Sequence, residues 1–112
     1  MSQIHATTYH RMTHVTGPGC VQVSLRFGAT PSDGPYVTYR VARNAPREPL
    51  LNVDEYVSEA IEGVAEANRL HGTSIGLLEI EIIPNDYPTK GQVRHCAKTL
   101  ATYLIQTKQS DD

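Results

Sequence analysis

Several features that would point to a function are scarce or missing in this sequence of 112 residues. No run approaches the roughly 18 consecutive apolar residues that a membrane span requires. The N-terminal segment lacks the basic and apolar regions of a secretion signal. We therefore expect a cytoplasmic protein without a membrane partner.

Charge of one sign is not in excess either. The chain has 10 Lys and Arg against 12 Asp and Glu, which gives a formal net charge of −2. No global basic field draws such a chain to nucleic acid, and we expect no DNA partner, although a local basic patch is compatible with this balance. No Gly-x-x-x-x-Gly-Lys loop occurs, so a P-loop nucleotide site is excluded.

The two cysteines, Cys20 and Cys96, leave two interpretations open. Their spacing matches no metal-ligand or redox motif. They either form a disulfide or are small thiols that lie in the interior. The second interpretation is favoured, because free cysteine is among the most buried residue types.

The length and the apolar fraction of 39% predict a single domain over residues 1–112. We expect residues 4–107 to fold and the polar residues 108–112 to form a frayed tail. Three strands are predicted in the first half. They cover residues 4–15, residues 21–27, where apolar and polar side chains alternate as in a sheet covered on one side, and the β-branched and aromatic residues 36–42.

A helix, a strand and a second helix are predicted to follow. Asn52, with Glu55 three residues later, predicts the start of the first helix, and His71-Gly72 predicts its end. A strand over residues 75–83 comes next, and Thr89 with Gln92 predicts the cap of the last helix. Each helix shows an apolar stripe at steps of three and four residues: Val53, Tyr56, Val57, Ala60, Ile61, Val64 and Ala65 in the first, and Val93, Cys96, Ala97, Leu100, Ala101 and Leu104 in the second.

This order predicts an α+β, two-layer sandwich: a four-stranded mixed sheet with two helices on one face, in the order β-β-β-α-β-α. It resembles domain IV of the translation elongation factor G family. The resemblance covers residues 19–25, 34–41, 53–64, 71–83 and 92–105 and is one of spacing and hydrophobicity.

In that family the domain reaches the ribosomal decoding region through loops at one end. The resemblance implies that the corresponding tip loops here contain Gly17, Pro18 and Gly19 and, in the second loop, Asn85 and Asp86. The family's Gly-rich tip hairpin is shortened to Gly-Pro-Gly, and Asp86, Tyr87 and Pro88 stand where its second loop carries a histidine. These 112 residues contain no GTPase domain, and we therefore do not expect a translocase.

Candidate catalytic and metal-binding residues each have a simpler structural explanation. Glu79 and Glu81 share one face of a strand about 7 Å apart, which is typical of the solvated side of a half-covered sheet. His10 and His14 also share a face, but at about 13 Å, too far apart to bind one zinc ion. We expect no catalytic residues, no metal and no cofactor, and a small enzyme ranks third among the functions considered.

Two kinds of partner are left open. Lys90, Arg94 and Lys98 recur at four-residue steps and predict a basic stripe for RNA, with Tyr87 as a stacking surface, although a solvated helix face explains the stripe equally well. Alternatively, the open face of the sheet binds a protein or a second copy of the chain. On that face we expect Tyr36, Leu77 and Ile83 beside Gln22, Ser24 and Glu81. The leading hypothesis is a non-catalytic binding module that contacts RNA or the ribosome; the alternative is a protein-interaction or homodimeric scaffold.

Overall fold

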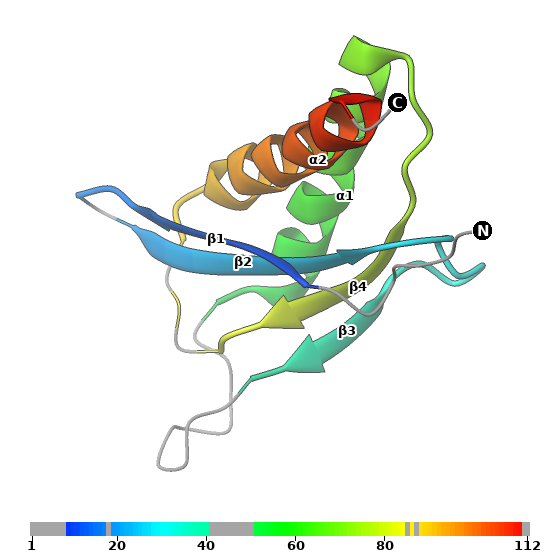
Figure 1. Ribbon diagram of the computed structural model, residues 1–112. Coiled ribbons are helices and arrows are strands. Elements are labelled where there is room, and N and C mark those ends of the chain that lie inside the picture. The colour runs from blue at the N-terminus through cyan, green and yellow to red at the C-terminus, as the bar shows by residue number, and fades with distance from the viewer. Residues whose placement is uncertain (1–8, 18, 41–50, 85, 87, 111–112) are drawn as a thin grey trace.

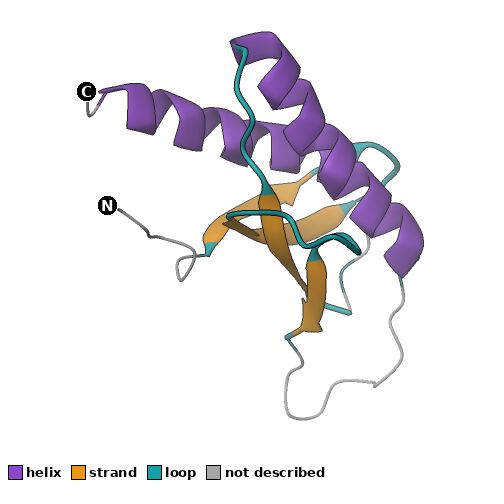
Figure 2. Cartoon of the chain, turned by 90° about the vertical axis from the view of Figure 1, so that its right-hand side faces the viewer, coloured by secondary structure: helices purple, strands orange, loops and turns teal. Residues whose placement is uncertain are grey.

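The predicted architecture is confirmed by a computed structural model, which describes residues 9–17, 19–40, 51–84, 86 and 88–110 (Figure 1). Two helices pack on one face of a four-stranded mixed sheet (Figure 2). In chain order the elements are β1 (His10–Val15), β2 (Cys20–Phe27), β3 (Tyr36–Tyr39), α1 (Val53–His71), β4 (Leu77–Ile82) and α2 (Gln92–Ser110).

The last strand in sequence lies inside the sheet. The spatial order is β1-β2-β4-β3, with β1–β2 and β2–β4 antiparallel and β3–β4 parallel. Because β3 and β4 run in the same direction, their carboxyl ends meet at the same edge of the sheet. The loop that follows β4 therefore starts beside the end of β3.

The register assigns each side chain to a face. Ile80 at the centre of β4 pairs with Leu25 on one side and Val37 on the other, and all three point toward the helices. The buried core consists of Val21, Val23, Leu25, Phe27, Tyr56, Ala60, Val64, Ala67, Leu77, Ile80, Ile82, Val93, Cys96, Ala97, Leu100, Ala101 and Ile105. The opposite face, which no described helix covers, carries the polar side chains.

The caps of α1 confirm the prediction from sequence. The Asn52 side chain accepts a hydrogen bond from the Glu55 N–H at 3.0 Å, and Gly72 ends the helix with a φ of 63°. The predicted stripe is partly wrong, because Ile61 is 44% exposed while Gly63 and Ala67 are buried. The stripe faces α2, and Gly63 lies in tight contact with the backbone of α2 at Arg94 and Lys98.

Several predicted boundaries are corrected. The first described strand begins at His10, and residues 4–8 lie outside the described part of the chain. The third strand ends at Tyr39, and residues 41 and 42 also lie outside it. The fourth strand begins at Leu77 because the Asn68 side chain bonds both the N–H and the C=O of Ile75, each at 2.9 Å. Residues 108–110, predicted to fray, continue α2, since no Gly or Pro interrupts the helix before Ser110.

The disulfide interpretation is wrong, because both thiols are free. Cys20 is half-buried at the start of β2, and its partner in the register is Val15 on the open face. Cys96 lies fully buried in α2, on the other side of the sheet. Burial raises the pKa of the Cys96 thiol to about 11, so this residue acts as a small apolar group of the core.

Candidate functional site

One end of the domain brings together the two loops that were predicted as tip loops (left side of Figure 1). It comprises the described residues of the turn 16–19 and of the loop 83–91, together with the first turns of α1 and α2. We call this region the tip end. Carboxyl ends of parallel strands and helix N-termini, which meet here, are frequent ligand-binding positions in α/β folds.

Gln92, the first residue of α2, joins the two loops. Its Oε1 atom accepts a hydrogen bond from the Thr89 N–H at 2.9 Å, which is one half of the predicted capping box. Its Nε2 atom donates to the main-chain oxygens of His14 at 3.1 Å and Gly19 at 3.4 Å, and lies 2.9 Å from Nδ1 of His14. Only 5% of Gln92 is exposed, so this amide is a buried link, here called the bracket, between β1, the turn 16–19 and α2.

Asp86 forms the second link between the loops. Its Oδ2 atom accepts the Gln22 N–H at 2.9 Å, a backbone donor just beyond the point where β2 and β4 stop pairing. Burial raises the pKa of the Asp86 carboxyl, and the hydrogen bond from Gln22 partly opposes this shift. The Gln22 carbonyl in turn accepts a hydrogen bond from the Tyr56 hydroxyl at 3.4 Å. Burial, reinforced by the Asp86 charge, raises the pKa of Tyr56 and keeps its hydroxyl protonated.

Glu59 on α1 caps the N-terminus of α2. Its two carboxylate oxygens accept the N–H groups of Gly91 at 3.0 Å and Arg94 at 3.2 Å. The first turn of α2 has no acidic residue of its own. The carboxylate that complements its helix dipole therefore comes from the neighbouring helix.

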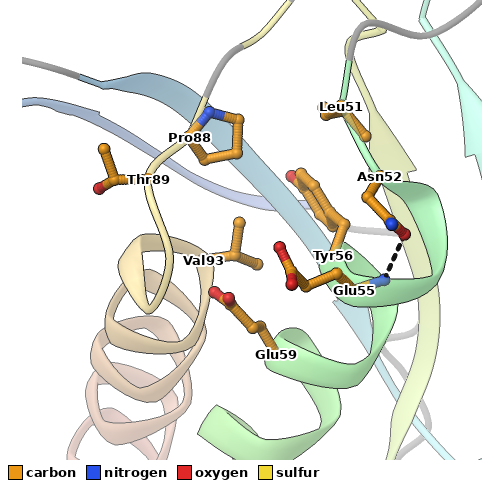
Figure 3. Close-up of a pocket in the computed structure, with 8 residues that line it drawn as sticks. All are labelled: Leu51, Asn52, Glu55, Tyr56, Glu59, Pro88, Thr89 and Val93. Atoms are coloured by element: carbon orange, nitrogen blue, oxygen red, sulfur yellow. Dashed lines mark hydrogen bonds between the residues drawn. The ribbon is translucent and has the colours of Figure 1, made fainter.

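A pocket of about 250 Å³ lies between the starts of the two helices (Figure 3). The carboxylates of Glu55 and Glu59 point into it from α1, and Val93 and Pro88 lie across from them. The remaining lining residues are Leu51, Asn52, Tyr56 and Thr89. With two carboxylates and a helix terminus that is already capped, this pocket does not suit an anion.

Two residues of the predicted basic stripe are engaged within the molecule. Arg94 and Lys98 reach the Glu66 carboxylate on α1 at 3.1 and 3.0 Å, and Arg94 also lies 4.0 Å from Glu62. The hydrogen bond from Lys98 lowers the pKa of Glu66, which therefore keeps its charge at neutral pH. Lys90 is exposed at the tip end.

The other predicted site residues are divided between described and undescribed parts of the chain. Gly17 is exposed. Gly19 is buried against the second loop, where a Cβ on Gly19 would lie 2.9 Å from the Thr89 backbone nitrogen. The structure thus brings Gly17, Gly19, Asp86 and Lys90 to one end, with Arg94 and Lys98 along the side of α2. Tyr87, Pro18 and Asn85 lie outside the described residues.

The open face of the sheet is a network of opposite charges. Arg26 pairs with Glu79 at 2.7 Å and Arg11 with Glu81 at 3.3 Å, and the Tyr9 ring lies within 5.2 Å of both guanidinium carbons. Glu79 is only 9% exposed, so the expectation of a solvated glutamate pair is wrong for this residue. Glu79 is thus paired with the adjacent strand β2, and Glu81 is paired with β1 across Ser24 of β2, so both glutamates stabilise the sheet.

Leu77 does not lie on the open face as predicted. The register shifts between Arg26 and Phe27, and the Phe27–Leu77 pair beyond this irregularity joins the core. Tyr36, Ser24 and Glu81 do share the open face, as the pairing of Tyr36 with Glu79 and of Ser24 with Glu81 requires. Ile83 follows the last residue of β4 and is half-buried.

Comparison with known proteins adds no relative. No protein-family model matches the chain, and no match is found among curated proteins or solved structures. Within the described ranges, neither helix combines the length and apolarity needed to cross a bilayer. The class of protein is defined by its fold and by the tip end: it is a two-layer α+β domain with paired loops at one end.

Glu59→Ala is expected to lower the free energy of unfolding by about 1–2 kcal/mol, because two backbone N–H groups lose their shared carboxylate acceptor. Chemical denaturation measures this loss. Glu62→Ala is the matched control on the same helix. The Glu62 side chain is 68% exposed, and its removal should change stability by less than about 0.5 kcal/mol. Equal losses in the two variants would show that Glu59 is not a cap.

Proposed function

We propose that this protein is a non-catalytic binding module that contacts RNA, such as that of the ribosome, with its tip end. The observation that carries the proposal is the junction of the two tip loops by Gln92 and Asp86, which unites segments far apart in sequence into one surface. A ribosomal role follows the resemblance to domain IV of elongation factor G. It would place the protein in the cytoplasm.

The hydrogen bonding at the tip end supports a binding role over catalysis. Glu59 caps α2, Asp86 holds the Gln22 N–H, and the Tyr56 hydroxyl is bound to the Gln22 carbonyl. Each of these groups serves the structure, and the buried Cys96 thiol has a raised pKa. The surface that results is preorganised, which lowers the entropic cost of binding a partner.

The charges of the tip end limit how RNA is bound. Lys90 is exposed there. Arg40, which directly follows β3, is also exposed, and its N–H bonds the carbonyl of Ile82, the last residue of β4. Arg94 and Lys98 neutralise Glu66 instead. We therefore expect weak binding with a small salt dependence, in which Lys90 contributes and Lys98 does not.

Binding of a decoding-region RNA hairpin, measured by fluorescence anisotropy over a range of salt concentrations, tests this function. Lys90→Gln should reduce the slope of log K against log salt by about 0.7–0.9, the amount expected for one lost phosphate contact. Lys98→Gln is the matched control on the same chain segment and should leave the slope unchanged.

Two outcomes would contradict the proposal. One is the absence of RNA binding even at low ionic strength. The other is an equal effect of the Lys90 and Lys98 variants, which would indicate nonspecific attraction to any lysine. A dimer in sedimentation, combined with no RNA binding, would instead favour self-association through the open face of the sheet.

A further inference from the structure

The bracket at the tip end contains a titratable side chain, His14, whose Nδ1 atom contacts the Gln92 amide. His14 on β1 points toward α2, and its Nδ1 atom lies 2.9 Å from Nε2 of Gln92. Which of these two atoms carries the hydrogen depends on the orientation of the Gln92 amide and on the tautomer of the imidazole.

The orientation of the amide follows from its other contacts. The Thr89 N–H requires an acceptor and faces Oε1, whereas the carbonyls of His14 and Gly19 require a donor and face Nε2. A flipped amide would place oxygen against two carbonyls and N–H against N–H. Nε2 of Gln92 carries two hydrogens for three acceptors: its shortest contacts are Nδ1 of His14 at 2.9 Å and the His14 carbonyl at 3.1 Å, and the Gly19 carbonyl at 3.4 Å shares one of these hydrogens. Because this amide nitrogen can only donate, Nδ1 of His14 accepts, and the imidazole is neutral with its hydrogen on its own Nε2 atom.

We propose that His14, Gln92 and His95 form a pH-sensitive latch between the β1–β2 hairpin and α2. Protonation of Nδ1 places an N–H opposite the Gln92 amide N–H and removes the acceptor. The His95 ring lies 5.1 Å from the His14 ring, centroid to centroid, so that two imidazolium groups would also repel each other. The latch is closed when His14 is neutral and opens when it is protonated.

Several other titratable and charged groups of the elements around the latch are bound to partners outside the His14–Gln92 contact. On α2, Arg94 and Lys98 are directed to Glu66 of α1, and Cys96 is buried with a raised pKa. The Glu59 carboxylate of α1 is bound to main-chain N–H groups of α2. The remaining groups are His10, which shares the helix-facing side of β1, the exposed Lys90 in the loop before α2, and Asp86, which holds the Gln22 N–H of β2.

The hairpin is the part that the latch releases. The Gly19 carbonyl, which the latch holds, also accepts the Thr16 N–H at 2.8 Å across the turn. The Thr89 N–H depends on Oε1 of Gln92. The amide protons of Thr16 and Thr89 therefore report the state of the latch from its two sides.

Hydrogen exchange of the intact chain by NMR tests the proposal at about pH 7.5 and at about pH 5.5, where a proton is more readily available to an imidazole. Protection factors correct for the intrinsic pH dependence of exchange. Those of Thr16 and Thr89 should fall about tenfold at the lower pH, as for the loss of one hydrogen bond, while that of Glu55 in the α1 cap stays constant. Unchanged protection at Thr16 and Thr89 would overturn the proposal.

His14→Asn supplies an amide oxygen as acceptor and no titratable group. In this variant the tenfold fall should vanish, whereas the matched control His71→Asn, at the end of α1, should retain it. A fall that persists in His14→Asn would assign the pH response to another group, such as Asp86, and would refute the latch.

The tautomer gives a test on the unmodified protein. The ¹⁵N shifts of the His14 ring at neutral pH should show hydrogen on Nε2 and none on Nδ1. The opposite tautomer would refute the latch whatever the behaviour of the variants. These readouts do not involve RNA, so they stand or fall independently of the proposed function.

Discussion

Replacing Gly63 by alanine is expected to lower the free energy of unfolding by about 2 kcal/mol, although alanine is the better helix former. A Cβ at this position would collide with the Arg94 carbonyl oxygen and lie 2.8 Å from the Ala97 Cβ and 2.9 Å from the Lys98 nitrogen. Two of these atoms belong to the backbone of α2, which cannot rotate aside as a side chain does. The helices must therefore move apart.

Equilibrium unfolding in urea measures this loss, and Gly17→Ala provides the matched substitution. An added Cβ at Gly17 meets no atom within 4 Å, and this residue is not among the described glycines with positive φ. Its replacement should change stability by less than about 0.5 kcal/mol. A neutral effect at Gly63 would mean that the two helices do not pack as closely as described here.

Ile80→Ala is expected to have a larger effect, a loss of about 3–4 kcal/mol. Ile80 is completely buried at the centre of the sheet and is paired with Leu25 and Val37 on its two neighbouring strands. Truncation removes apolar contacts and leaves a cavity, because a strand held on both sides cannot collapse into the space.

Ile61→Ala tests whether burial, and not the residue type, determines this loss. Ile61 is 44% exposed on α1, where alanine also has the higher helix propensity, so we expect a change below about 1 kcal/mol. The same urea titrations serve for both variants. Similar losses at Ile61 and Ile80 would contradict the assignment of the core.

The elements that could be predicted from sequence are those specified by local patterns. Alternation in β2 places Val21, Val23 and Leu25 on the buried face. The helix α1 begins after Asn52, whose side chain accepts a backbone N–H, and ends at Gly72, which adopts a positive φ. The order of six elements was sufficient to predict the two layers. Ile61 was misplaced because the apolar stripe is wider than the strip of α1 that contacts α2.

The contacts of the candidate site could not be predicted, because they join distant segments. Gln92 meets His14 across 78 residues of sequence, and Glu59 meets Arg94 across 35. Lys98 looks like a free cation in the sequence of α2, and its pairing with Glu66 depends on the helix–helix contact that Gly63 permits. The signal in the sequence was the predicted capping box, which places the Gln92 side chain at the start of α2, next to Thr89.

The interior position of β4 has a consequence for the order of events during synthesis. Within the described sheet, β3 has β4 as its neighbour, and β4 also separates β3 from the β1–β2 hairpin. While residues up to 76 emerge, β3 therefore exposes both of its edges and cannot complete the sheet with the strands made before it. The sheet is completed only when β4 pairs with β3, and this contact spans the whole of α1. Until the last third of the chain has been made, the exposed strand edges therefore leave the nascent protein prone to aggregation.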